Sequence, residues 1–181
     1  MQRLQPLAVS DAPAASQPLL EGAQKKLGRI PNLFAALAVS PVALQSYFSL
    51  GEVLGKGAFT PRQRELIALA AAEVNECGYC TAAHSAIGGS LGIETEALVG
   101  ARTGQLADAS EAALVRFTNQ VIASRGAVSD ADLQAFVDAG FSDEHVAELI
   151  ANVAVNTLTN YFNRAARTEV DFPAAPELQR A

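Results

Sequence analysis

The stretch that decides the fold covers residues 73–84 and reads Glu73-Val74-Asn75-Glu76-Cys77-Gly78-Tyr79-Cys80-Thr81-Ala82-Ala83-His84. It holds both cysteines of the chain, in a C-x-x-C motif, and one of its two histidines. If the segment is helical, steps of about 100° per residue place Cys77, Cys80 and His84 within an arc of roughly 60°. Such a face supplies what a dithiol redox site needs: an attacking thiolate, a second thiol to close a disulfide, and a base.

Other interpretations of the C-x-x-C motif stay open at this point. A thioredoxin-like site would need a βαβ pattern, whereas the flanking sequence is helical. A zinc site would need four ligands, of which His84 is a candidate third, while His145 lies far along the chain. The pair could also form a purely structural disulfide, and His84 could be an ordinary core histidine. We favour the redox site because His84 is in register with both thiols.

Glu65 is the candidate partner of His84. If the helices before and after the turn fold back on one another, Glu65 lies about ten residues before the turn and His84 about eight after it, so the two come nearly level. A carboxylate there would orient His84 and stabilise its protonated form, which gives a relay Glu65–His84–Cys80 of the triad type. The alternative, equally compatible with the spacing, is a surface glutamate paired with Arg62 or Arg64.

Composition bounds the class of protein. The chain has 181 residues, half of them hydrophobic, which suits one globular domain with a sizeable core. Its net charge of -6 argues against nucleic acid and anionic membranes as partners, because both select basic surfaces. No apolar run reaches the length of a membrane span, and the first residues lack a signal-peptide core. We therefore expect a cytoplasmic protein, in which two close cysteines are more often catalytic or metal-binding than structural.

The hydrophobic periodicity predicts an all-α fold, because the alternation typical of strands is missing. Thr60-Pro61-Arg62-Gln63 is a strong helix start with a capping box, and Ser16, Ser40, Ser110 and Ser142 are further candidate caps. The helix that follows Ser40 is expected to present Val42, Leu44, Tyr47, Phe48, Leu50 and Leu54 as its apolar set. The expected helices span residues 16–28, 33–38, 41–54, 61–74, 77–88, 94–101, 110–124, 130–139 and 143–167.

These helices define the domain organisation. Residues 1–15 are interpreted as an extended N-terminal arm, weakly ordered alone and suited to lie on another subunit. Residues 16–170 form the helical domain, and residues 171–181 form a C-terminal tail without helix. So many apolar helix faces in a small domain favour an oligomer.

The motif resembles a known family. Glu65, followed by Cys77-Gly78-Tyr79-Cys80 and His84 at the spacing E-x11-C-x-x-C-x3-H, is similar to the AhpD-like alkylhydroperoxidase branch of the carboxymuconolactone decarboxylase family. The similarity extends to three further segments, which resemble peroxidase-related members of that family: Gly28-Arg29-Ile30-Pro31-Asn32, the helix with Ser110-Glu111 and Ala113-Leu114, and Asn160-Tyr161-Phe162-Asn163-Arg164.

The resemblance implies an all-α, AhpD-like helical bundle that assembles into trimers or hexamers. It also implies that Cys80 is the peroxidatic cysteine, that Cys77 resolves it, and that Glu65 and His84 form the proton relay. The best-known AhpD enzymes have a histidine just before the second cysteine, where this chain has Tyr79. The decarboxylase branch lacks the cysteine pair, so its reaction is not implied.

The function expected from the sequence is therefore that of a thiol-dependent peroxidase. Cys80 attacks a peroxide, Cys77 closes a disulfide, and an external dithiol or thiol reduces it. No metal, haem or flavin cofactor is required, and no G-x-G-x-x-G motif for a nucleotide is present. The alternative is a non-enzymatic redox sensor that uses the same disulfide as a switch.

Overall fold

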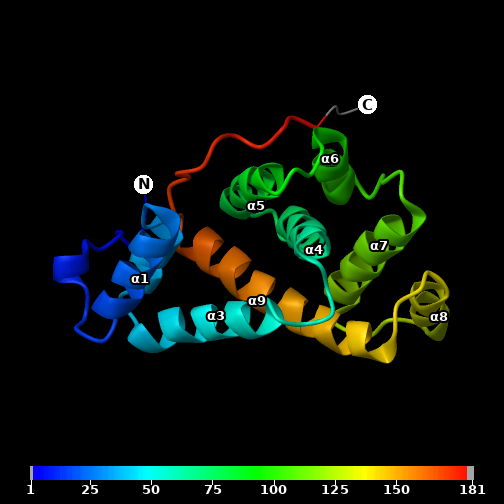
Figure 1. The fold of residues 1–181 in the computed structure, drawn as a ribbon, viewed down its shortest axis with the longest axis horizontal. Coiled ribbons are helices and arrows are strands. Elements are labelled where there is room, and N and C mark those ends of the chain that lie inside the picture. The colour runs from blue at the N-terminus through cyan, green and yellow to red at the C-terminus, as the bar shows by residue number, and fades with distance from the viewer. Residues whose placement is uncertain (1, 179–181) are drawn as a thin grey trace.

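The computed structural model describes residues 2–178, and within them it contains helices and no strand (Figure 1). The all-α prediction is confirmed. A short 3-10 helix, Val9–Asp11, precedes α1 (Gln17–Leu27), α2 (Asn32–Leu37), α3 (Pro41–Leu54), α4 (Pro61–Val74), α5 (Gly78–Ser90), α6 (Thr95–Thr103), α7 (Ala109–Ser124), α8 (Asp130–Asp138) and α9 (Asp143–Ala166).

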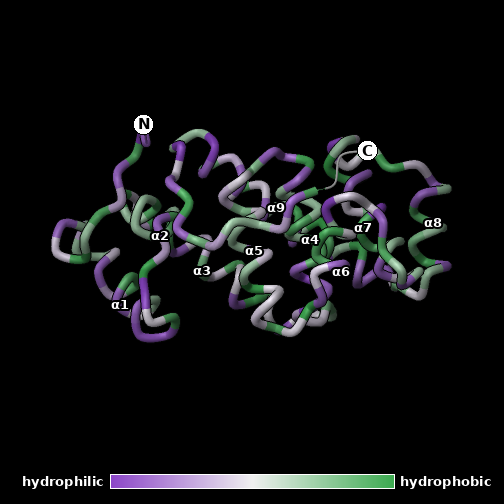
Figure 2. Tube along the Cα trace, turned by 90° about the horizontal axis from the view of Figure 1, so that it is seen from above, coloured by the Kyte–Doolittle hydropathy of each residue, from purple (hydrophilic) through white to green (hydrophobic). Residues whose placement is uncertain are grey.

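Helix α4 is the centre of the molecule. Every residue from Leu66 to Ala72 is buried, on all sides of the helix, which is typical of a helix surrounded by others. Helices α5, α6, α7 and α9 pack around it (Figure 1), and the alanines among these residues allow a close approach. In Figure 2 hydrophobic segments of the trace gather around α4 and α7. This central helix carries Glu65 and leads directly into the cysteine pair.

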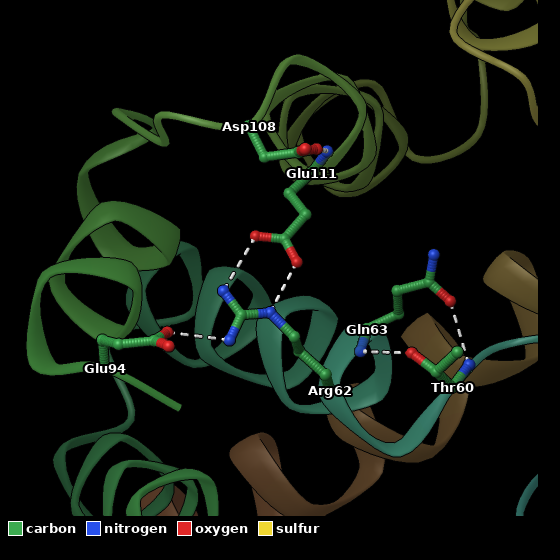
Figure 3. A network of polar contacts seen from close by, with 6 residues as sticks. All are labelled: Thr60, Arg62, Gln63, Glu94, Asp108 and Glu111. Atoms are coloured by element: carbon green, nitrogen blue, oxygen red, sulfur yellow. Dashed lines mark hydrogen bonds and ion pairs between the residues drawn. The ribbon is translucent and has the colours of Figure 1, made fainter. Parts of the chain in front are cut away.

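The first turn of α4 is fixed by local and long-range polar contacts (Figure 3). Thr60 Oγ1 accepts a hydrogen bond from the Gln63 amide at 3.2 Å, and Gln63 Oε1 accepts one from the Thr60 amide at 2.9 Å. This is the predicted capping box. Arg62 Nε lies 2.6 Å from Glu111 on α7, and Arg62 Nη1 lies 2.9 Å from Glu94 before α6. Three helices are thereby tied at one point.

Two predicted caps are wrong. Ser16 precedes α1 but makes no capping bond, and its hydroxyl donates to the Ala38 carbonyl at 2.8 Å instead. The other is Ser110. Helix α7 begins one residue before Ser110, and its cap is Asp108, whose Oδ1 accepts a hydrogen bond from the Glu111 amide at 2.9 Å. Ser110 lies inside the first turn and donates to the Ala139 carbonyl instead. Both residues are good caps by type, and the sequence alone does not say which of them begins the helix.

Two residues assigned to the apolar set of α3 are exposed. Val42 is 76% exposed and Leu50 is 39% exposed, whereas Leu44 is fully buried. Helix α3 lies at the edge of the molecule, against α2 and α9 (Figure 1). An edge helix buries a narrower stripe than its apolar composition suggests.

The N-terminal segment packs on its own chain. The Arg3 amide donates to the Ala166 carbonyl at 2.7 Å, and the Leu7 amide donates to the Ala35 carbonyl at 3.1 Å. Ala12 is buried in the cluster of apolar residues beneath α1 and α2. The first residues thus connect α2 with the end of α9.

Candidate active site

The turn between α4 and α5 sets the position of the cysteines. Glu76 adopts a left-handed conformation with φ 51°, while the Cys77 amide donates to the Ala72 carbonyl at 2.8 Å and the Glu76 amide to the Glu73 carbonyl at 3.0 Å. These two bonds form a Schellman motif. It ends α4 sharply and makes Cys77 the N-cap of α5.

Helix α9 clamps this turn from outside. Arg164 donates through Nη1 to the Asn75 carbonyl at 2.6 Å, and its Nη2 lies 3.0 Å from a carboxylate oxygen of Glu76. Asn75 Nδ2 donates to Asn160 Oδ1 at 2.9 Å within the buried interface. The last turns of α9 therefore hold the start of α5 in place.

The two cysteines form a disulfide in the first turn of α5, with their Cα atoms 5.3 Å apart. Cys77 Sγ also accepts a hydrogen bond from the Cys80 amide at 3.2 Å, as an N-cap side chain does. Both residues are buried, with 1% and 3% of their surfaces exposed. The predicted redox pair is thus closed as a disulfide at the start of a regular helix.

Glu65 and His84 meet as the fold-back of α4 and α5 predicts. Glu65 Oε2 lies 2.8 Å from His84 Nδ1, and both side chains are largely shielded from solvent. The alternative partners are engaged elsewhere, since Arg62 binds Glu111 and Arg64 donates to the Phe59 carbonyl. With Nδ1 held by the carboxylate, the other ring nitrogen of His84 is left to exchange a proton.

A cavity of about 250 Å³ opens beside Cys80 and His84. The rest of its wall is mostly apolar and aromatic, from α1, α2, α3, α5, α9 and the C-terminal tail. The lining residues are Leu27, Arg29, Pro31, Leu33, Phe34, Tyr47, Tyr79, Cys80, Ala83, His84, Ile87, Thr159, Asn163 and Phe172. We call it the His84 cavity.

Tyr47 joins this cavity from α3. Burial raises the pKa of Tyr47 to about 12, and the negative charge of Glu65 adds to the rise. The phenol therefore keeps its proton at neutral pH and is able to donate a hydrogen bond. The sequence placed Tyr47 on a core-facing stripe and gave no signal for this position beside Glu65.

Asn163 is the polar neighbour of Cys80 that sequence reasoning missed. Its Nδ2 donates to Cys80 Sγ at 3.4 Å, and its Oδ1 is buried without a hydrogen-bond partner among residues 2–178. A disulfide sulfur only accepts hydrogen bonds, so the amide nitrogen must face it. Asn163 lies in a segment that resembled the family, but no residue role followed from that resemblance.

Tyr79 connects α5 with α2 and with the tail. Its hydroxyl accepts a hydrogen bond from the Leu33 amide at 3.2 Å, and its ring meets the edge of Phe172 at a centroid distance of 5.7 Å. Burial raises the pKa of Tyr79 above its usual range, and the carboxylate of Asp171 adds to the rise. Tyr79 is thus a neutral packing residue of the cavity wall.

The tail is fastened over the His84 cavity. Asp171 Oδ2 accepts from the Asn32 amide at 3.0 Å and lies 3.1 Å from Arg29 Nη2, whose guanidinium also stacks 4.4 Å from the Phe172 ring centroid. Farther along, Arg102 on α6 donates to the Pro176 carbonyl at 2.6 Å. Figure 1 shows the tail crossing from the end of α9 past α5 to α6.

Two searches of the described residues bear on ligands and membranes. Nowhere in residues 2–178 do three His, Cys, Asp or Glu side chains gather where they could share a metal ion. No helix in this part of the chain combines the length and apolar character of a membrane span.

Comparison with known proteins agrees with this arrangement. Residues 41–118 match the sequence model of the Carboxymuconolactone decarboxylase family. That span runs from α3 into α7 and contains Glu65, Cys77, Cys80 and His84. No curated protein matches the chain significantly.

Solved structures share the fold over nearly the whole chain. One is an uncharacterised peroxidase-related protein from Ralstonia eutropha JMP134 with an alkylhydroperoxidase AhpD core. It is 24% identical in sequence, and the match covers 94% of this chain and 92% of that chain with a TM-score of 0.85. Another, from Silicibacter sp. TM1040, has 23% identity, coverage of 93% and 91%, and a TM-score of 0.81. The debrominase Bmp8 in complex with 2,3,4-tribromopyrrole has 21% identity, coverage of 93% and 91%, and a TM-score of 0.77.

Proposed function

Since the chain belongs to the carboxymuconolactone decarboxylase family through its residues 41–118 and has the AhpD-like fold, we propose that it is a thiol-dependent peroxidase. One observation carries the proposal. The Cys77–Cys80 pair lies on the same helix as His84, His84 is held by Glu65 at 2.8 Å, and Cys80 shares a cavity with that histidine. A redox dithiol, an oriented base and a substrate-sized space are thereby combined.

The first step of the proposed reaction is activation of Cys80. His84, oriented through Nδ1 by Glu65, takes the thiol proton with its other ring nitrogen, directly or through one water. The resulting thiolate is stabilised by the Asn163 amide and by the N-terminus of α5, whose first turn holds the sulfur. The site therefore places positive partial charge where the thiolate forms.

The next steps transfer two electrons to the peroxide. The thiolate of Cys80 attacks the terminal peroxide oxygen, the O–O bond breaks, and the alkoxide leaves with the proton held by His84. Cys80 is now a sulfenic acid. The thiol of Cys77 attacks this sulfur, a disulfide forms, and water leaves. An external thiol or dithiol returns the two electrons and completes the cycle.

The unpartnered oxygen of Asn163 suits the sulfenic acid intermediate. Before the disulfide closes, Cys80 carries a hydroxyl donor that needs an acceptor inside a buried site. Asn163 Oδ1 is such an acceptor, and no other residue of the described chain uses it. One amide can thus serve the thiolate through its nitrogen and the sulfenic acid through its oxygen.

The cavity wall favours organic hydroperoxides as substrates. Phe34, Leu33 and Phe172 offer apolar surface, while His84 and Cys80 supply the polar end. Burial of an alkyl or aryl group contributes roughly 25 cal/mol per Å² of apolar area, which hydrogen peroxide does not offer. We therefore propose a lower KM for cumene hydroperoxide than for hydrogen peroxide.

Turnover tests the proposal. The protein is mixed with excess dithiothreitol and cumene hydroperoxide, and hydroperoxide loss is followed. An enzyme consumes many equivalents per subunit, and Cys80→Ser abolishes the loss. The sensor alternative is supported if each subunit consumes about one equivalent and then stops.

A second candidate is reductive dehalogenation, since one similar structure is a debrominase in complex with 2,3,4-tribromopyrrole. The aromatic side chains Phe34, Tyr47 and Phe172 around the His84 cavity would suit a flat halogenated ring. Here the Cys80 thiolate takes a halogen from carbon, a proton replaces it, and Cys77 expels halide as the disulfide closes. Halide release from a bromopyrrole with dithiol present, without peroxide consumption, would favour this candidate.

A further inference from the structure

A second cavity, of about 260 Å³, opens at the other sulfur. Cys77 lines this cavity and Cys80 does not, whereas Cys80 lines the His84 cavity and Cys77 does not. Its wall consists of Cys77, Gly78, Tyr79, Asn163, Arg164, Arg167 and Thr168. We call it the Arg167 cavity. Each cysteine of the disulfide therefore faces its own cavity, on opposite sides of Asn163 and Tyr79, which line both.

The Arg167 cavity is basic in an acidic protein. The guanidinium of Arg164 is already bound to Asn75 and Glu76, but Arg167 lies within 4.0 Å of no acidic side chain in residues 2–178. The chain as a whole carries a net charge of -6. An unneutralised guanidinium beside a reactive sulfur attracts anions to that point of the surface.

Two buried polar atoms of this wall lack partners. Thr168 Oγ1 and Asn163 Oδ1 have no hydrogen bond among residues 2–178, although their residues are only 8% and 3% exposed. A buried polar group without a partner destabilises a folded protein. The Thr168 hydroxyl can donate to an anionic oxygen of a ligand in this cavity, whereas Asn163 Oδ1 only accepts hydrogen bonds and suits the sulfenic acid of Cys80. The N-terminus of α5, which begins beside this cavity, adds to its preference for anions.

We propose that the Arg167 cavity is the binding site for the reductant, and that the reductant is a thiol bearing a carboxylate. Arg167 binds the carboxylate, and the sulfur of the ligand reaches Cys77. The inference rests on the proposed function in one respect, namely that the Cys77–Cys80 disulfide is an intermediate of turnover. Peroxide and reductant then approach the disulfide from two different cavities.

The reduction is balanced as two thiol–disulfide exchanges. The thiolate of the ligand attacks Cys77 Sγ, the Cys77–Cys80 bond breaks, and Cys80 leaves as a thiolate. A second thiol attacks the sulfur of the bound ligand, which releases the oxidised ligand as its disulfide and frees Cys77 as a thiolate that takes up a proton. In total, two thiols are oxidised and one protein disulfide is reduced.

Attack at Cys77 also gives the better leaving group. The thiolate that departs is Cys80, which the Asn163 amide contacts at 3.4 Å and which shares a cavity with His84. A leaving sulfur whose negative charge is stabilised departs faster. The same groups that activate Cys80 towards peroxide therefore favour its release during reduction.

The test measures the reduction step alone. Oxidised protein is mixed in a stopped-flow instrument with mercaptopropionate, which is anionic, or with mercaptoethanol, which is neutral, and the rates per thiolate are compared at low ionic strength. Arg167→Gln should lower the ratio of the anionic to the neutral rate about threefold to tenfold, and Arg167→Lys should keep most of it. The matched control is Arg125→Gln, because Arg125 also occupies the left-handed C-cap of a helix, with φ 56° against 53° for Arg167.

A second measurement locates the attacked sulfur. The reaction with mercaptopropionate is quenched early with N-ethylmaleimide and digested, and mass spectrometry identifies which cysteine carries the ligand. A mixed disulfide at Cys77 with alkylated Cys80 is expected. The proposal is overturned if the ligand is found on Cys80, or if the rate ratio is the same in Arg167→Gln as in the wild type. Failure of the peroxidase proposal has a different signature, since charge-selective reduction would persist without peroxide consumption.

Discussion

Among single residues, replacement of Glu65 is expected to change the reactivity of Cys80 in a way that depends on pH. In reduced protein, Glu65→Gln removes the carboxylate that fixes the His84 ring through Nδ1, so the imidazole is no longer held in the orientation in which it accepts the Cys80 proton. General-base help of this kind typically contributes about 10²–10⁴-fold in rate. We expect alkylation of Cys80 by iodoacetamide at pH 7 to slow at least about tenfold, with the rate recovering at high pH, where the thiol ionises unaided.

Glu73→Gln is the matched control for this experiment. Glu73 lies on the same helix and also accepts from a cation, Arg102, at 2.9 Å, but it contacts no histidine. Its replacement should leave the pH profile of Cys80 alkylation unchanged. A loss of equal size at every pH in Glu65→Gln would indicate disturbed packing, and wild-type reactivity would make Glu65 an ordinary ion-pair residue.

Asn163 has a separate effect on the same thiol. In Asn163→Ala the Cys80 thiolate loses its amide donor, and a hydrogen bond to a charged group is worth about 1.5–3 kcal/mol. Iodoacetamide alkylation of Cys80 near neutral pH should therefore slow by roughly tenfold or more. Asn156→Ala is the comparison, because Asn156 is also buried on α9 but donates only to the Asn152 carbonyl, at 2.8 Å. Similar losses in both variants would refute a specific role for Asn163.

The residues of the candidate site differ in how far the sequence could predict them. Cys77, Cys80, His84 and Glu65 belong to adjacent helices joined by a tight turn, so helical spacing alone brings them together. Asn163 is separated from Cys80 by 83 positions, and its contact depends on how α9 packs against α5. No local pattern encodes that packing.

At the scale of helices, local sequence signals predicted where helices start and end more accurately than they predicted which residues are buried. The capping box at Thr60 and the cap at Ser40 depend on side-chain bonds over three residues, and both are present in the structure. Which side of a helix is covered depends on its neighbours, which is why the exposure of Val42 on α3 was missed. The cap of α7 shows the limit of the local rule, because two suitable residues stood two positions apart.

Helix α5 allows a sharp test of packing between elements. Gly88 faces α6 so closely that a Cβ atom there would lie 2.6 Å from Leu98 Cδ2, whereas a Cβ atom on Gly89 would meet nothing within 4 Å. Gly89→Ala should stabilise the protein by about 0.5–1 kcal/mol, because alanine loses less backbone entropy in a helix. Gly88→Ala should destabilise it by about 1–3 kcal/mol through overpacking.

Urea unfolding of both variants measures the difference. A Gly88→Ala protein as stable as Gly89→Ala would mean that Leu98 moves aside freely. His84 lies one turn before Gly88 on the same helix, so Gly88→Ala should also alter the pH profile of Cys80 alkylation.

At the scale of the whole molecule, exposed apolar residues on α3 predict self-association. Val42 and Val53 are 76% and 67% exposed, and their separation of eleven residues places them within about 20° on the helix. We expect a trimer or hexamer by light scattering at micromolar concentration, and Val53→Asp should dissociate it. Val137→Asp is the control, since Val137 is also an exposed valine but lies on α8 and not on α3. A monomeric wild-type protein would contradict the prediction.

The contacts that α9 makes with the turn before Cys77 can form only late in the synthesis of the chain. Protein synthesis adds about 5–20 residues per second, so Asn163, which follows Cys80 by 83 positions, is made about 4 to 17 s later. During that interval Arg164 does not yet hold the turn, and the amide beside Cys80 does not yet exist. If Asn163 stabilises the Cys80 thiolate as proposed, that stabilisation is complete only after the chain has been extended past residue 163.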